Sequence, residues 1–128
     1  MTNDDQIRLR ILLAAHPLLT IFGYGEYGKP LLATTEGREE LLKATAEIDM
    51  ARAWLRTQER RETLNHNHSS YGLKHLAESA MDGYISNGAF IAAALLDGWI
   101  VRRIDDSSPN VRLNIRERTV RNSGEIHP

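Results

Sequence analysis

Apolar residues recur at helical spacing in several stretches of the chain, and turn-forming residues separate those stretches. The most regular pattern predicts a helix that begins at Thr34 or Thr35 and extends at least to Thr57, with Glu62 as its furthest end. One face of this helix would carry the apolar residues Leu41, Ala44, Ile48, Ala51, Trp54 and Leu55.

An earlier helix is predicted from a cap at Thr2 or Asn3 to the residue before Pro17, because that position disfavours helical backbone. The next stretch, Leu18–Ala33, holds three glycines among aromatic residues and predicts a loop packed through its own rings. Its glycines match the dinucleotide-binding spacing, but no strand precedes them and Pro30 stands where the helix should open. We therefore interpret the stretch as an ordered loop.

The stretch over residues 66–98 combines the densest polar chemistry with the most apolar helix of the chain. Ser69 or Ser70 can cap an amphipathic helix, which Gly83 ends. After a short turn, a second helix covering Ala89 to Leu96 is apolar on every side, and such a helix is normally buried. We expect this second helix to form the centre of the core.

Near the C-terminus, two runs flank a loop of turn-forming residues: Trp99 to Ile104, and Val111 to Arg116. The second run alternates apolar and polar residues, so a β-hairpin with one face on the core is predicted. Beyond Arg118 the periodicity is lost. We therefore expect a single globular domain over residues 1–118 and a flexible tail over residues 119–128.

The predicted fold class is α+β, with about four helices followed by a C-terminal β-hairpin. The order of helix, short turn, helix and hairpin is that of a winged helix-turn-helix. One feature disagrees, because the helix in the recognition position carries base-reading side chains only at its start, at Ser86 and Asn87. Any DNA contact would then be made mostly through phosphates.

The chain has 128 residues, no cysteine and a formal net charge of -1. The lack of cysteine excludes disulfides and thiolate chemistry, and it fits a reducing compartment such as a bacterial cytoplasm. No apolar run approaches the roughly 20 residues of a membrane span, and the first residues are acidic, unlike a secretion signal. We expect a cytoplasmic protein without membrane contact and without a cofactor.

Basic residues concentrate in two segments, whereas acidic residues concentrate before residue 50. The first basic segment runs from residue 52 to residue 75, and its arginines at 52, 56 and 60 would form a ridge on a helix. The second carries the arginines between residues 102 and 121. Such asymmetry favours one positive surface that could meet phosphate or an acidic protein, although a ridge of this kind can also be a solvated side.

Several polar residues gather at the start of the predicted amphipathic helix, where free backbone amides and the helix dipole favour an anion. These residues are Asn65, Ser70, Tyr71, Lys74 and His75. A surface salt bridge beside a packed tyrosine is the structural alternative. Acid–base catalysis by the last three of these residues is a further alternative, but no activated nucleophile or paired carboxylate accompanies them.

Three histidines, His66, His68 and His75, lie close together in the sequence and could ligate a metal ion. The first two precede the predicted helix and the third lies on it. No helical His-x-x-x-His pair and no carboxylate in motif register accompanies them. No metal site is therefore predicted.

Four stretches carry a resemblance to known proteins: Arg-Glu-Thr-Leu-Asn, Ser-Ser-Tyr-Gly-Leu-Lys-His-Leu-Ala-Glu, Tyr-Ile-Ser-Asn-Gly-Ala-Phe-Ile-Ala-Ala-Ala, and Pro-Asn-Val-Arg-Leu-Asn-Ile. Over roughly residues 60–118 the chain resembles small uncharacterised proteins carried by bacterial phages, plasmids and integrative elements. The resemblance implies a mobile-element setting, in which small domains often bind host machinery, including as inhibitors of CRISPR or restriction systems.

Together these patterns predict a non-enzymatic binding module that engages nucleic acid or a nucleic-acid-bound host complex, with a homodimer left open. The residues expected at this anion-binding surface are Arg52, Arg56, Arg60, Asn65, Ser70, Tyr71, Lys74, His75, Ser86, Asn87, Arg102, Arg103, Arg112 and Arg116. The alternative is a protein-only inhibitor of a host defence system, anchored by Phe22, Tyr24 and Tyr27. The third hypothesis is a small enzyme that uses Tyr71, Lys74 and His75.

Overall fold

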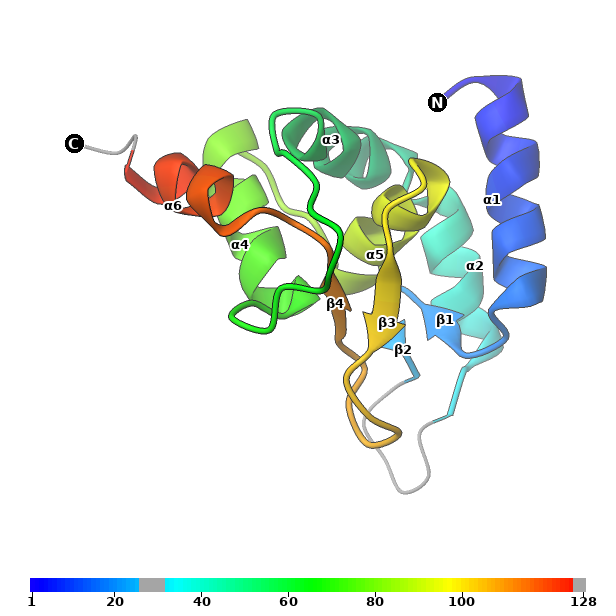
Figure 1. Cartoon of the computed structure of the whole chain (residues 1–128). Helices are drawn as coiled ribbons and strands as arrows, with labels where there is room; N and C mark the ends of the chain where they lie inside the picture. Colours follow the sequence, from blue (N-terminus) through cyan, green and yellow to red (C-terminus); the bar gives the residue numbers. More distant parts are fainter. Residues whose placement is uncertain (26–31, 126–128) are drawn as a thin grey trace.

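The computed structural model describes residues 1–25 and 32–125. Within these ranges it contains helices together with two small antiparallel β-hairpins, so the predicted α+β class is confirmed. Helix α5 (Asn87–Leu96) lies in the middle of the molecule (Figure 1). Helices α1 (Asn3–Ala15), α3 (Thr45–Leu55) and α4 (Ser70–Met81) pack around it.

Helix α5 is the core helix that the sequence predicts. The Ser86 side chain accepts a hydrogen bond from the Ala89 N–H at the start of the helix, and all its residues except Leu95 are buried. The ring of Phe90 lies 6.0 Å from that of Trp54 in α3. A recognition helix must expose one face to a DNA groove. The buried α5 cannot do so, and a winged helix-turn-helix arrangement is not confirmed.

The N-terminal part of the chain contains more structure than predicted. Helix α1 begins at a capping box formed by Thr2, which is one of the two predicted caps. The stretch expected to be a loop then holds a short hairpin of β1 (Leu19–Thr20) and β2 (Gly23–Tyr24). This hairpin lies against α5 at Gly88, whose N–H donates to the Ile21 carbonyl oxygen at 2.9 Å.

The long helix predicted after Thr34 is two helices in the structure, α2 (Thr35–Lys43) and α3. Ala44 leaves the helical conformation, with φ -81° and ψ 44°, and joins the two. No proline or glycine marks this position in the sequence. The change of direction lets both helices bury apolar residues, Leu41 from α2 and Ile48 from α3.

The predicted C-terminal hairpin is present as β3 (Val101–Arg103) paired with β4 (Val111–Leu113). Beyond it, the prediction of a flexible tail from residue 119 is wrong for the described part, because residues Glu117–Glu125 form helix α6. Val120 anchors this helix in the core and is 2% exposed. Residues 126–128 lie outside the described residues.

The helices in the described part of the chain are too short, or too polar, for any of them to cross a lipid bilayer.

Candidate functional site

The two basic segments of the sequence lie side by side in the structure. The chain between α3 and α4 runs antiparallel to the end of β4 and the residues after it, and an isolated bridge pairs Arg60 with Ile115. The Arg61 N–H donates to the Asn114 carbonyl oxygen at 2.8 Å, and the Asn65 N–H donates to that of Leu113 at 2.8 Å. Segments about fifty residues apart therefore share one region of the surface.

Some arginines of these two segments form no ion pair with a carboxylate among the residues that the structure describes. All are at least partly exposed. Two of them face each other directly across the β3–β4 ladder, where like charges are destabilising. We call this set the arginine cluster, and it consists of Arg56, Arg60, Arg61, Arg102 and Arg112.

Backbone carbonyl groups hold two members of the arginine cluster in place. The Arg112 guanidinium donates to the His66 carbonyl oxygen at 2.7 Å. That of Arg60 donates to the carbonyl oxygens of Asp97 and Gly98, at 2.7 and 3.0 Å, and lies over the Trp99 ring. A carbonyl positions a guanidinium without cancelling its charge. These groups are therefore oriented and still carry a full positive charge.

Arg56 and Arg60 also line a hollow of about 370 Å³ together with Gln58 and Asp97. Gln58 is 8% exposed, and its side-chain oxygen has no hydrogen-bond partner among the described residues. The hollow therefore combines two guanidinium groups with a polar wall, at the end of the surface where α3 stops.

The prediction that Arg52 belongs to a basic surface ridge is wrong. Its side chain is 11% exposed and forms ion pairs of 2.9 Å with Asp5 from α1 and with Asp97 after α5. Hydrogen bonds from the Arg52 side chain and the Thr2 backbone lower the pKa of Asp5 from 3.8 to about 2. Since α3 ends at Leu55, the other two arginines of the proposed ridge lie beyond the helix.

Two further arginines of the predicted surface have carboxylate partners. Arg103 is half-buried, lies over the Tyr24 ring and has Asp106 at 3.8 Å. Arg116 is exposed and pairs with Glu59 at 3.3 Å. These partners offset the charge of both side chains, so we leave both arginines out of the arginine cluster.

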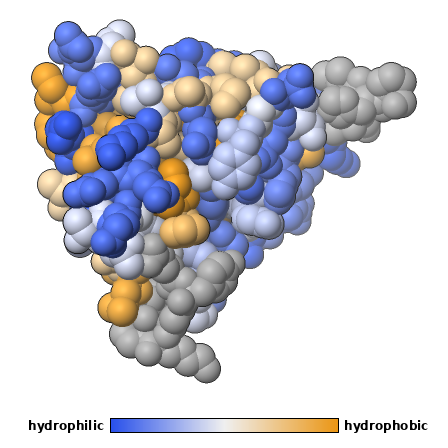
Figure 2. Space-filling model, turned by 180° about the vertical axis from the view of Figure 1, so that it is seen from behind, coloured by the Kyte–Doolittle hydropathy of each residue, from blue (hydrophilic) through white to orange (hydrophobic). Residues whose placement is uncertain are grey.

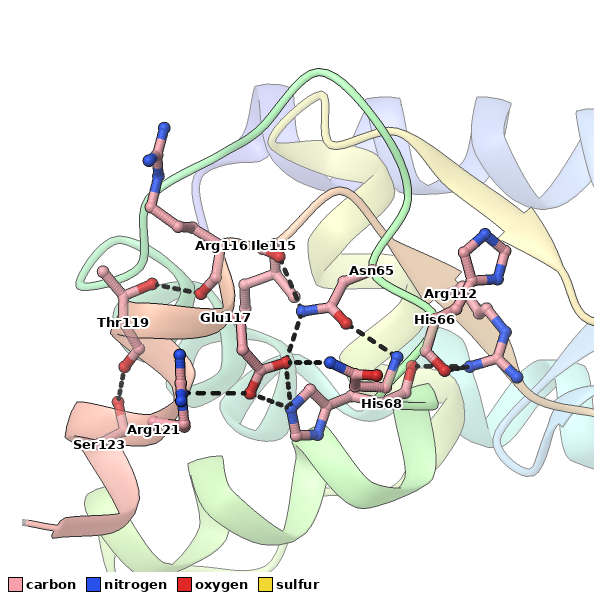
Figure 3. A network of polar contacts seen from close by, with 11 residues as sticks. Asn65, His66, His68, Arg112, Ile115, Arg116, Glu117, Thr119, Arg121 and Ser123 are labelled. Carbon is pink, nitrogen blue, oxygen red and sulfur yellow. Dashed lines mark hydrogen bonds and ion pairs between the residues drawn. The ribbon is translucent and has the colours of Figure 1, made fainter.

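Asn65 has a structural role instead of the predicted surface role. It is 2% exposed, and its amide donates to the Ile115 carbonyl oxygen and to the Glu117 carboxylate (Figure 3). The same carboxylate binds the His68 ring at 3.0 Å. Hydrogen bonds from His68 and from the neighbouring amide side chains lower the pKa of Glu117 from 4.5 to about 2. This network joins α6 to the loop before α4.

The predicted anion site at the start of α4 is not formed as expected. Ser69 caps the helix, whereas Ser70 is fully buried and its hydroxyl accepts from the Val111 N–H at 3.0 Å. Lys74 is 5% exposed and has Glu78 at 3.4 Å. Only Tyr71 and His75 of the predicted group are exposed, and the ring of His75 contacts the same Glu78 carboxylate at 2.9 Å.

Lys74 belongs to a second feature that the sequence does not single out, an aromatic hollow of about 110 Å³. The Lys74 ammonium group lies 5.1 Å from the centre of the Tyr71 ring and 5.0 Å from the centre of the Tyr84 ring. Phe22 completes the aromatic side, and Asn87 lies at the wall. The only sequence signal for Tyr84 was an aromatic residue in the turn between two helices.

The predicted protein anchors differ in their exposure to solvent. Phe22 is exposed, as an anchor requires, but Tyr24 is buried and its hydroxyl bonds the His16 ring at 2.8 Å. Tyr27 lies outside the described residues. Ser86 and Asn87, expected at the binding surface, are also buried.

Figure 2 shows hydrophobic residues reaching the surface near the middle of the back face as well as over α1.

Comparison of the chain with protein-family models, with curated proteins and with solved structures found no match in any of the three.

Proposed function

We propose that the chain is a non-enzymatic binding module that engages nucleic acid, or a complex that holds nucleic acid, through its arginine cluster. One observation carries the proposal. The fold places two distant segments that carry arginines without carboxylate partners side by side, and it places Arg102 opposite Arg112 despite their repulsion. Guanidinium groups match phosphate geometry, and a bound phosphate would remove the repulsion.

The type of recognition follows from which element carries the charge. The arginine cluster lies on strands and on the 56–65 segment, and the buried α5 offers no face for reading base edges. Contacts to phosphates position a protein on nucleic acid but carry little sequence information. We therefore expect weak sequence preference and strong dependence on salt.

The proposed setting is the cytoplasm of a bacterium that carries a mobile element, with a host nucleic-acid-processing complex as the wider partner. The first support is the resemblance of residues 60–118 to mobile-element proteins. The second is the arrangement of the charged groups. A surface that binds phosphates without sequence preference suits a target that is defined by a host complex and not by a DNA sequence.

The test is the affinity of the whole chain for a labelled duplex, measured by fluorescence anisotropy between about 50 and 200 mM salt. We expect binding that weakens steeply with salt. The double variant Arg102→Gln, Arg112→Gln should lower the slope of log affinity against log salt by about 2, because each phosphate contact contributes about 0.9. Absence of binding to nucleic acid at low salt would contradict the proposal.

Arg10→Gln is the matched control, because Arg10 is an exposed arginine on α1, outside the arginine cluster. It should leave the affinity and the salt slope almost unchanged. If it weakens binding as much as the double variant does, the arginine cluster has no special role. Affinity purification with and without nuclease completes the test, since a host protein retained after nuclease treatment would favour the protein-only inhibitor.

A further inference from the structure

Three aromatic side chains around the aromatic hollow remain largely exposed, although the two tyrosine rings also contact Lys74. Phe22, Tyr71 and Tyr84 are 53%, 51% and 66% exposed, although burying such rings is strongly favourable. They surround one hollow and come from three separate parts of the chain. Scattered exposed aromatics need no explanation, but rings gathered around one hollow indicate a contact surface.

Two buried polar side chains, Lys74 and Asn87, lie at the wall of the aromatic hollow. Lys74 is almost fully buried between the two tyrosine rings, so its ammonium group holds both at a set separation. Asn87 is 6% exposed and donates through its amide nitrogen to the Phe22 carbonyl oxygen and to the Asn110 side chain. Its side-chain oxygen has no hydrogen-bond partner among the described residues.

Exposed aromatic rings favour a flat partner that stacks on them. A nucleobase offers such a flat aromatic surface, and the strand that carries it offers phosphates for the nearby arginines. The chemistry of the aromatic hollow therefore matches an unpaired base better than a phosphate or an aliphatic side chain.

The start of α4, which carries Tyr71, is hydrogen-bonded to β4, which carries Arg112. The Val111 N–H donates to the Ser70 hydroxyl at 3.0 Å. Arg112 follows the first of these residues in the chain, and Tyr71 follows the second. A strand of nucleic acid with a base in the hollow could therefore place its next phosphates at Arg112.

Charge also fixes the direction in which such a strand leaves. On the other side of Phe22 and Tyr84 lies a second hollow of about 370 Å³, whose lining includes the carboxylates of Glu40 and Glu47 as well as Lys43. The excess of carboxylates disfavours phosphates there. The path toward Arg112 is the favourable one.

We infer that the aromatic hollow binds one unpaired base of single-stranded nucleic acid while the arginine cluster binds the phosphates that follow. This inference rests on the proposed function and narrows its ligand to a single strand. Stacking on aromatic side chains tolerates any base, since every base has a flat face. The expected selectivity is therefore for the unpaired state and not for a sequence.

The experiment compares the binding of the whole chain to an oligothymidylate, to an abasic oligonucleotide of equal length and to a duplex, at one salt concentration. The wild type should bind the oligothymidylate about tenfold more tightly than the abasic strand. Phe22→Ala and Tyr84→Ala should each remove most of that difference. Both side chains are more than half exposed, so the variants should fold normally.

Ile11→Ala is the control, because Ile11 is an apolar residue on α1 that is 62% exposed. It should change none of the affinities. The ring variants should also keep the salt slope of the wild type, because they remove no charge. A smaller salt slope in these variants would mean that the rings act on phosphates, and it would overturn the inference.

The outcomes separate this inference from the proposed function. If the ring variants bind every oligonucleotide as the wild type does, while the double arginine variant is weakened, the proposed function stands and the base site is wrong. If the wild type binds no oligonucleotide at low salt, both fail. If the ring variants lose only a nuclease-resistant host protein, the hollow is a protein-docking site and the inference is wrong.

Discussion

Gly88 is the residue whose replacement should have the clearest effect on stability. A Cβ atom at this position would lie 1.9 Å from the Thr20 carbonyl oxygen and 2.7 Å from the Ile21 carbonyl carbon. Both obstacles are backbone atoms of the β1 turn, so they cannot rotate away. We expect Gly88→Ala to lower the free energy of unfolding by about 3 kcal/mol, the upper part of the usual range for overpacking, as measured by urea denaturation.

Gly72→Ala is the matched control, with an effect of the opposite sign. Gly72 is exposed within α4, and the nearest atom to an added Cβ is the Ser69 hydroxyl oxygen at 4.0 Å. Alanine favours helix over glycine by about 1 kcal/mol, so this variant should be more stable than the wild type. A Gly88→Ala variant as stable as the wild type would show that α5 does not approach β1 this closely.

Single residues were predicted well where their neighbours in the sequence decide their role, and poorly elsewhere. The caps at Thr2 and Ser69 follow from local pattern, and both form. Arg52 looked like part of an exposed ridge, but its partners Asp5 and Asp97 are 47 and 45 residues away in the chain. No local pattern reports an ion pair of that kind.

Helix α6 is an element whose attachment should depend on pH. The Glu117 carboxylate in its first turn binds side chains of the loop before α4, and its pKa is lowered from 4.5 to about 2. The ionised form therefore stabilises the fold above about pH 4.5, and this contribution is lost as the pH falls toward 2. Glu117→Gln should cost roughly 1 kcal/mol at neutral pH, since solvent screens a partly exposed group.

The measurement for this element is the free energy of unfolding of both proteins across the acid range. The difference between the wild type and Glu117→Gln should shrink as the pH falls from 4.5 to about 2, because the wild-type carboxylate becomes protonated across this range. Glu62→Gln, an exposed carboxylate in the segment between α3 and α4, should show no such trend. A pH-independent difference for Glu117→Gln would contradict the assigned role of the charge.

At the scale of elements, the sequence predicts those that bury many apolar residues. Helix α5 was found because its residues are apolar on every side. Helix α6 was missed because Val120 is its one apolar side chain, so no repeated apolar spacing marks it in the sequence. The break at Ala44 was missed for a different reason, since alanine suits both a helix and its end and the apolar spacing continues through it.

At the scale of the whole molecule, the candidate site was predicted in part. The sequence showed that two segments are rich in arginine, and the antiparallel path of residues 59–65 along β4 brings them together. The aromatic hollow was out of reach of sequence analysis. Its rings come from Phe22, Tyr71 and Tyr84, and only the packing of the β1–β2 turn, α4 and the turn before α5 makes them neighbours.

The position of α5 also predicts how the whole molecule unfolds. This helix packs against α1, α3 and α4 and against both hairpins, so no large part of the described chain has a core of its own. We expect one cooperative transition, with tryptophan fluorescence from Trp54 and Trp99 coinciding with the loss of helical circular dichroism. Phe90→Ala should move both signals together and lower the free energy of unfolding by about 3 to 5 kcal/mol, because Phe90 is fully buried in α5. Two separate transitions, or a shift in only one signal, would mean that the hairpin side and the α1 side fold independently.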